Sequence, residues 1–207
     1  MAEWFRKTSW TEADRVDFEK RLARSRPASR AQYLRIQAAH LAEAGEHGAA
    51  LALLAELLEN YDAPIHRAQA LLQRAQSCDA LDDVAGSLEA YRAALAAERE
   101  TQNVRTRVGF EFPLFVARRN LQGAFVEALS VLESAESQAT FTADRFEVAA
   151  ARSLIAWSRG DADRAKTHAA IALQAAAERH SGLSRHPTVG LVRADPALLE
   201  RLRALTG

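Results

Sequence analysis

One pattern recurs four times along the chain and restricts the fold more than any other feature. A turn residue (Gly45, Asp82, Gly123 or Gly160) is followed five positions later by a small residue. The residue twelve positions before this small residue is also small in three of the four cases. Small side chains on two antiparallel helices let the backbones approach closely, and glycine ends a helix because it accepts positive φ. Each recurrence therefore predicts a helical hairpin, and hairpins of this kind must stack to bury their apolar faces. The paired positions are Ala38 with Ala50, Ala75 with Ser87, Val116 with Ala128, and Ser153 with Ala165.

Helix formers fill most of the sequence, and apolar residues recur at spacings of three and four, as in Leu34, Ala38 and Leu41. Thr11, Asp82, Asp161 and Asp195 stand where helix N-caps are expected, and Ser29 to Gln32 has the form of a capping box. The pattern predicts helices over residues 11–25, 29–44, 47–61, 64–80, 83–99, 104–121, 124–138, 142–159, 161–180 and 195–205.

Over about residues 30–180 the chain resembles the tetratricopeptide repeat family, as about four divergent repeats. The match is carried by Ala38, Leu41, Gly45, Ala50 and Leu54, by Ala75, Cys78, Tyr91, Ala94 and Leu95, and by Ser153, Gly160, Ala165, Ala172 and Leu173. The small residues Ala50, Ser87, Ala128 and Ala165 lie 37, 41 and 37 positions apart, against 34 in the family. In the third repeat Pro113 interrupts the first helix and Arg119 replaces an apolar residue, which leaves its geometry open.

The resemblance implies an all-α fold, a right-handed superhelical stack of antiparallel helix hairpins that forms an α-solenoid. Residues 29–180 would be the repeat domain. Residues 1–28 would be an N-terminal amphipathic capping helix, and residues 181–207 a C-terminal loop and capping helix. The tail over 181–194 is expected to cover the open flank of the last repeat, with a plug in the groove as the alternative.

The resemblance also implies a non-catalytic module that binds a peptide or protein segment on its concave face, which the first helix of each repeat lines. Amide and guanidinium groups there can pair with a peptide, while Leu72, Leu154 and Trp157 offer apolar pockets. The alternative is that these side chains are ordinary solvated or packing residues. A clamp for a C-terminal carboxylate, known in the family, is not expected, because Gln69, Gln73 and Leu114 occupy its places. The predicted partner-binding residues are Arg35, Gln69, Gln73, Gln76, Asn120 and Trp157.

The aromatic start of the chain allows two interpretations. Trp4, Phe5 and Trp10 precede a helix with Phe18 and Leu22 one turn apart. Such a helix can cover the exposed end of a repeat array. Alternatively, the three aromatic side chains dock a partner or a second copy of the chain, which would make the protein a self-associating structural or regulatory subunit.

Composition argues against several other classes. Acidic and basic residues number 27 each, so no overall field favours nucleic acid, and only about 30 residues precede the first repeat, too few for the usual DNA-binding bundle. No apolar run suggests a signal peptide or a membrane span, and the single cysteine, Cys78, fits a reducing cytoplasm. His40, Glu43 and His47 lack the spacing of a metalloprotease motif, and the histidines are expected at the surface. We therefore expect no enzyme activity, cofactor or metal.

Overall fold

The structure, a computed structural model, describes residues 3–181 and 186–207. Ten α-helices and one 3₁₀ turn account for the secondary structure of these residues, with no strand among them. All ten predicted helices are confirmed, and the largest difference is α6, which is shorter than the predicted 104–121. The elements are α1 Glu12–Arg24, α2 Pro27–Glu43, α3 His47–Asn60, α4 Pro64–Ala80, α5 Val84–Glu100, α6 Val108–Arg118, η1 Gln122–Ala124, α7 Phe125–Glu136, α8 Thr142–Ser158, α9 Ala162–Ala177 and α10 Pro196–Ala204.

Side-chain caps define several helix starts. Thr11 forms a capping box with Asp14, and Asp161 and Asp195 accept hydrogen bonds from the first turns of α9 and α10, as predicted. Two predicted caps are wrong. The N-cap of α5 is Asp83 and not the predicted Asp82. Ser29 does not cap α2, because that helix begins two residues earlier, at Pro27, and Ser29 lies in its first turn.

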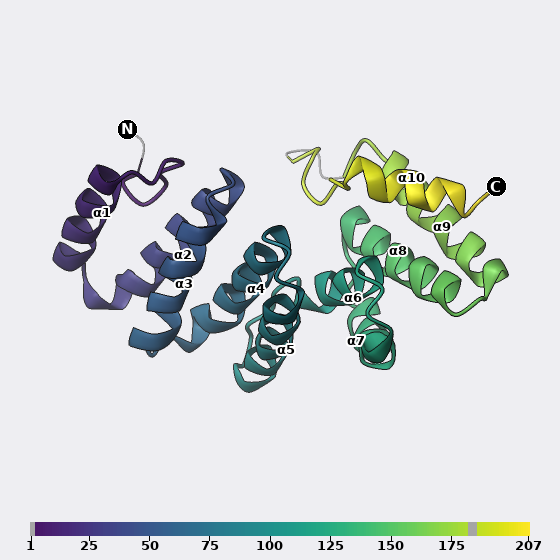
Figure 1. The fold of residues 1–207 in the computed structure, drawn as a ribbon, viewed down its shortest axis with the longest axis horizontal. Coiled ribbons are helices and arrows are strands. Elements are labelled where there is room, and N and C mark those ends of the chain that lie inside the picture. Colours follow the sequence, from purple (N-terminus) through teal and green to yellow (C-terminus); the bar gives the residue numbers. More distant parts are fainter. Residues whose placement is uncertain (1–2, 182–185) are drawn as a thin grey trace. The chain divides into compact units, whose positions relative to one another are not determined.

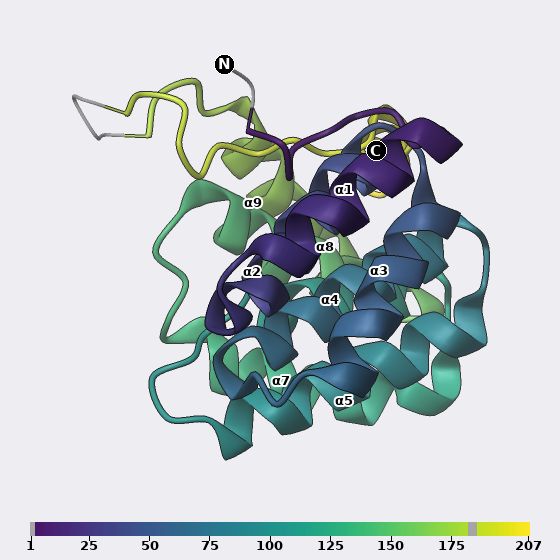
Figure 2. The same cartoon turned by 90° about the vertical axis from the view of Figure 1, so that its left-hand side faces the viewer.

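The chain divides into two compact units, Met1–Val108 and Gly109–Gly207. In the first unit α2 packs against α3, α4 packs against α5, and both α2 and α3 contact α4 (Figure 1). Helix α1 lies across the outer side of the α2–α3 hairpin (Figure 2). Its buried residues Phe18 and Leu22 join the core cluster that includes Leu34, Leu54 and Leu57.

The predicted pairing of small residues is confirmed directly in two of the four hairpins. All eight paired side chains are buried, and in two hairpins a hydrogen bond joins the pair itself. The Ser87 hydroxyl of α5 donates to the Ala75 carbonyl of α4 over 2.9 Å, and the Ser153 hydroxyl of α8 donates to the Ala165 carbonyl of α9 over 2.8 Å. A hydroxyl that reaches the partner backbone requires the close helix approach that the sequence pattern predicts.

The hairpin turns share one hydrogen-bond motif. The residue after each turn donates its N–H to a carbonyl five positions earlier, as in Glu46 to Leu41 at 2.8 Å and Asp161 to Ala156 at 3.0 Å. Gly45, Asp82 and Gly160 adopt the positive φ that this motif needs. The motif therefore sets the same exit geometry at the end of each first helix.

The third turn differs from the prediction. Asn120, with φ of 52°, takes the left-handed position there, and Gly123 lies in the 3₁₀ turn η1. This three-residue turn is inserted between the helix-ending motif and α7, and it accounts for most of the longer spacing between Ser87 and Ala128.

The second unit contains α6 to α10. Helix α6 continues through Pro113, and a Cβ added at Gly109 would lie 3.0 Å from the Ala135 side chain, so the start of α6 lies against the end of α7. Helix α8 pairs with α9, and α10 packs on both through its buried residues Leu198 and Leu202. Of the tail predicted over 181–194, residues 182–185 lie outside the described residues.

Candidate functional site

Four polar residues of α4 form one stripe. His66, Gln69, Gln73 and Gln76 are spaced three and four apart, so they share one face of the helix. Helix α2, which contributes Arg35, packs against α4. The first helices of two successive hairpins, which pack together, thus carry four of the six predicted residues. We call Arg35, His66, Gln69, Gln73 and Gln76 the α2–α4 face.

Arg35 has an unusual environment for a guanidinium group. Its side chain is half-buried, and burial lowers the pKa of Arg35. No hydrogen bond or ion pair links this side chain to the described residues, and its Nε atom is fully buried. Burial also lowers the pKa of His66, and the positive charge of Arg35 lowers it further. Both effects favour the neutral form of His66, and no carboxylate of the described residues pairs with the positive charge of Arg35.

Gln73 is a second unsatisfied group on the α2–α4 face. Its Oε1 atom is buried and accepts no hydrogen bond from any residue that the structure describes. Gln69 is partly buried, and Gln76 is exposed. A buried acceptor without a donor costs free energy, about 1–3 kcal/mol. The face therefore presents one unpaired cation and one unpaired acceptor, both stabilised by any ligand that supplies an anion and a donor.

The remaining two predicted residues belong to the second unit. Asn120 lies in the turn after α6, where its Oδ1 accepts a 2.7 Å hydrogen bond from the Ser158 hydroxyl. Trp157 precedes that serine at the end of α8 and is 52% exposed. Two predicted apolar pocket residues, Leu72 and Leu154, are instead 1% exposed and belong to the helix-packing cores, so that interpretation of them was wrong.

The aromatic residues of the N-terminus pack against their own chain. Trp4 lies 5.3 Å from Phe18 and 5.0 Å from Tyr33 between ring centroids, and Phe5 lies 4.6 Å from Tyr33. The ring of Trp10 lies 5.5 Å from that of Phe18. These side chains are partly buried against the core of the first unit, between α1 and α2.

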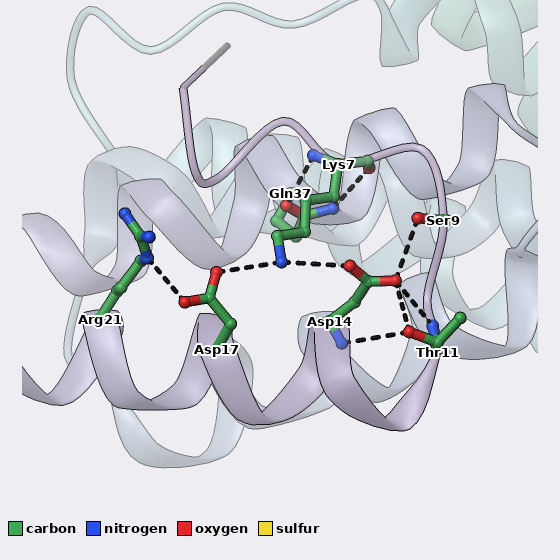
Figure 3. A network of polar contacts seen from close by, with 7 residues as sticks. All are labelled: Lys7, Ser9, Thr11, Asp14, Asp17, Arg21 and Gln37. Atoms are coloured by element: carbon green, nitrogen blue, oxygen red, sulfur yellow. Dashed lines mark hydrogen bonds and ion pairs between the residues drawn. The ribbon is translucent and has the colours of Figure 1, made fainter. Parts of the chain in front are cut away.

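A polar network holds the same segment (Figure 3). Gln37 of α2 has no exposed surface, and its side-chain amide pairs with the main chain of Lys7. The Lys7 N–H donates to Gln37 Oε1 over 3.0 Å, and Gln37 Nε2 donates to the Lys7 carbonyl over 2.7 Å. The ammonium group of Lys7 lies between Asp14, at 3.2 Å, and Asp17, at 3.0 Å.

Asp14 is the centre of this network. One of its oxygens accepts hydrogen bonds from Ser9 and from the N–H and hydroxyl of Thr11. These hydrogen bonds, led by that of the Thr11 hydroxyl and reinforced by Lys7, hold the pKa of Asp14 well below its usual range. The pKa of Asp17 is lowered by Arg21 and then by Lys7.

Sequence reasoning missed two of these residues. His66 was expected at the surface, but it is half-buried beside Arg35. Gln37 occupies the apolar stripe of α2 next to Leu34, Ala38 and Leu41, and a polar residue in such a stripe was the available signal.

Within residues 3–181 and 186–207, no group of three His, Cys, Asp or Glu side chains is placed to hold a metal ion. Over the same residues, no helix combines the length and the apolar character that crossing a bilayer requires. Cys78 is buried, and burial raises the pKa of its thiol.

Comparison of the chain with family models, with curated proteins and with solved structures finds no match.

Proposed function

We propose that this protein is a non-catalytic interaction module of the tetratricopeptide kind, which binds an extended segment of a partner protein on the α2–α4 face. The hairpins with matched small-residue pairs and a common turn motif support the repeat interpretation. The superhelical stacking of all four repeats, and the concave surface it creates, are part of the same proposal.

The uncompensated guanidinium group of Arg35 carries the proposal. An unpaired half-buried charge destabilises the fold, so its presence is explained when a ligand completes it. We infer that the ligand presents a carboxylate to Arg35 and a hydrogen-bond donor, such as a peptide N–H, to Gln73 Oε1. Gln69 and Gln76 lie on the same helix face, and in this proposal their amides pair with the ligand backbone.

The test is selection from a random peptide library on the full chain, followed by affinity measurement of the selected peptides by fluorescence anisotropy. We expect Asp or Glu to be enriched at one position. Binding should weaken at least tenfold in Arg35→Met, because a desolvated charge pair is lost. Arg67→Met removes the same charge from an exposed position of α4 and should leave the affinity unchanged.

Three results would refute the proposal: no selected binder, binders without an acidic residue, or equal affinity for the wild type and Arg35→Met. Comparing the binding of peptides with free and with blocked C-termini shows whether the carboxylate belongs to an acidic side chain or to the peptide terminus. If binding depends on the free C-terminus, the carboxylate that pairs with Arg35 is that of a chain end and not that of an acidic side chain.

A further inference from the structure

The segment Glu3–Trp10 is bound to α1 and α2 in the way that proteins bind a peptide ligand. The side-chain amide of Gln37 makes two hydrogen bonds to the main chain of one residue, Lys7: it accepts from the N–H and donates to the carbonyl. Exchange of an N–H and a carbonyl with a single residue is the pairing found between neighbouring strands. Gln37 therefore recognises an irregular backbone segment without regard to the side chain at that position.

The side chains around Gln37 supply selectivity. Trp4 and Phe5 contact Tyr33, and Trp4 also contacts Phe18, so the surface accepts two adjacent aromatic residues. The carboxylates of Asp14 and Asp17 lie on either side of the Lys7 ammonium group. Because both carboxylates lie within 3.2 Å of that ammonium group, the position two residues after the aromatic pair favours a cation.

We propose that Phe18, Tyr33 and Gln37, with Asp14 and Asp17, form a second peptide-binding site, the α1–α2 site. Its ligand is a segment of a partner protein with two adjacent aromatic residues followed, two positions later, by lysine. Residues 3–10 are the intramolecular occupant, which the partner segment displaces. The acidic character of the α1–α2 site selects this basic aromatic segment, whereas the α2–α4 face is basic, so the two sites take different ligands.

Displacement follows from the geometry. A tethered segment competes at an effective concentration in the millimolar range, so a free peptide binds the wild-type chain weakly. The double substitution Trp4→Ala/Phe5→Ala, which we call the release variant, weakens the binding of residues 3–10 but leaves Phe18, Tyr33, Gln37 and both aspartates in place. The affinity of this variant for a free peptide should therefore rise.

The probe is a labelled, end-capped peptide with the sequence of residues 3–10, EWFRKTSW, titrated onto the full chain. We expect the release variant to bind it at least tenfold more tightly than the wild type does. Adding Gln37→Ala should weaken binding at least tenfold, and a peptide with glutamate in place of its lysine should not bind. The matched control is Gln32→Ala, which changes an exposed glutamine of the same helix.

A second measurement uses the wild-type chain and needs no variant. In NMR spectra, millimolar peptide should move the indole N–H signals of Trp4 and Trp10 toward their positions in a free segment. Equal binding with and without Gln37, or unchanged indole signals, would overturn the proposal. A wild-type dimer in light scattering that dissociates in Gln37→Ala would also overturn it, because the occupant would then be a second copy of the chain.

Discussion

Gln37 allows a sharp test of how the first unit is held together. Replacing it with methionine keeps the length and approximate volume of the side chain but removes both hydrogen bonds to Lys7. Each bond contributes about 1 kcal/mol net, so the free energy of unfolding should fall by about 2 kcal/mol. The loss is limited to this size because the segment can detach, after which water satisfies the Lys7 main chain.

The assay is urea unfolding followed by tryptophan fluorescence. The chain has three tryptophans, and the exposed Trp157 lies in the second unit. In a Trp157→Phe background, Trp4 and Trp10 alone report on the N-terminal segment. With an m-value of about 2 kcal/mol/M, a loss of about 2 kcal/mol lowers the midpoint by about 1 M.

Gln32→Met is the control, because Gln32 is an exposed residue of the same helix and should change the stability by less than about 0.5 kcal/mol. If Gln37→Met shifted the midpoint no more than this control does, the pairing of Gln37 with Lys7 would not hold the segment. The same conclusion would follow if the emission of Trp4 and Trp10 in native buffer were unchanged.

Three further predictions concern other parts of the structure. Arg35→Met should raise the stability of the ligand-free protein by about 1 kcal/mol, measured by urea unfolding, because it removes an unpaired half-buried charge; a loss of stability would show that Arg35 is compensated in solution. Ser87→Ala and Ser153→Ala should each cost about 1 kcal/mol in the same assay, since each leaves a buried carbonyl without its hydroxyl donor, and unchanged midpoints would contradict the close helix approach. Asp14 and Asp17 have lowered pKa values in the folded protein, so the stability they contribute is full above their unfolded pKa, near 4, and is lost progressively as the pH falls from there through their folded pKa values. The melting temperatures of the wild type and of Asp14→Asn/Asp17→Asn should therefore differ at pH 6 and converge toward pH 2, and a constant difference would contradict this sign.

The sequence predicted the helices and their pairing because both depend on local spacing. Helix formers, N-caps and small residues twelve positions apart predict α4, α5 and their pairing, and none of these signals depends on another element of the fold. The prediction for the third hairpin was wrong at Gly123, because two residues that favour turns, Asn120 and Gly123, lie within four positions of each other. Composition does not say which of them adopts positive φ, and the structure selects the asparagine and inserts η1.

The candidate sites were harder to predict because they depend on contacts between elements. The helical register placed Arg35 and the α4 glutamines on neighbouring helices, since the hairpin repeat fixes which faces meet. It did not reveal that Arg35 would lack a carboxylate, because pairing depends on the position of every acidic side chain nearby. Gln37 and Lys7 are 30 positions apart, and only the folded chain brings them together.

The contrast between Lys7 and Arg35 shows why the second is the better indicator of function. Acidic and basic residues are equal in number, so the chain has carboxylates enough to pair its buried cations. Lys7, with 22% of its side chain exposed, pairs with two carboxylates, whereas Arg35, also partly buried, pairs with none among the described residues. Both side chains lie within one compact unit, so the difference reflects local placement and not a shortage of acid. Because the fold pairs Lys7 with two carboxylates and Arg35 with none of the described ones, Arg35 is the place to expect the negative charge of a partner.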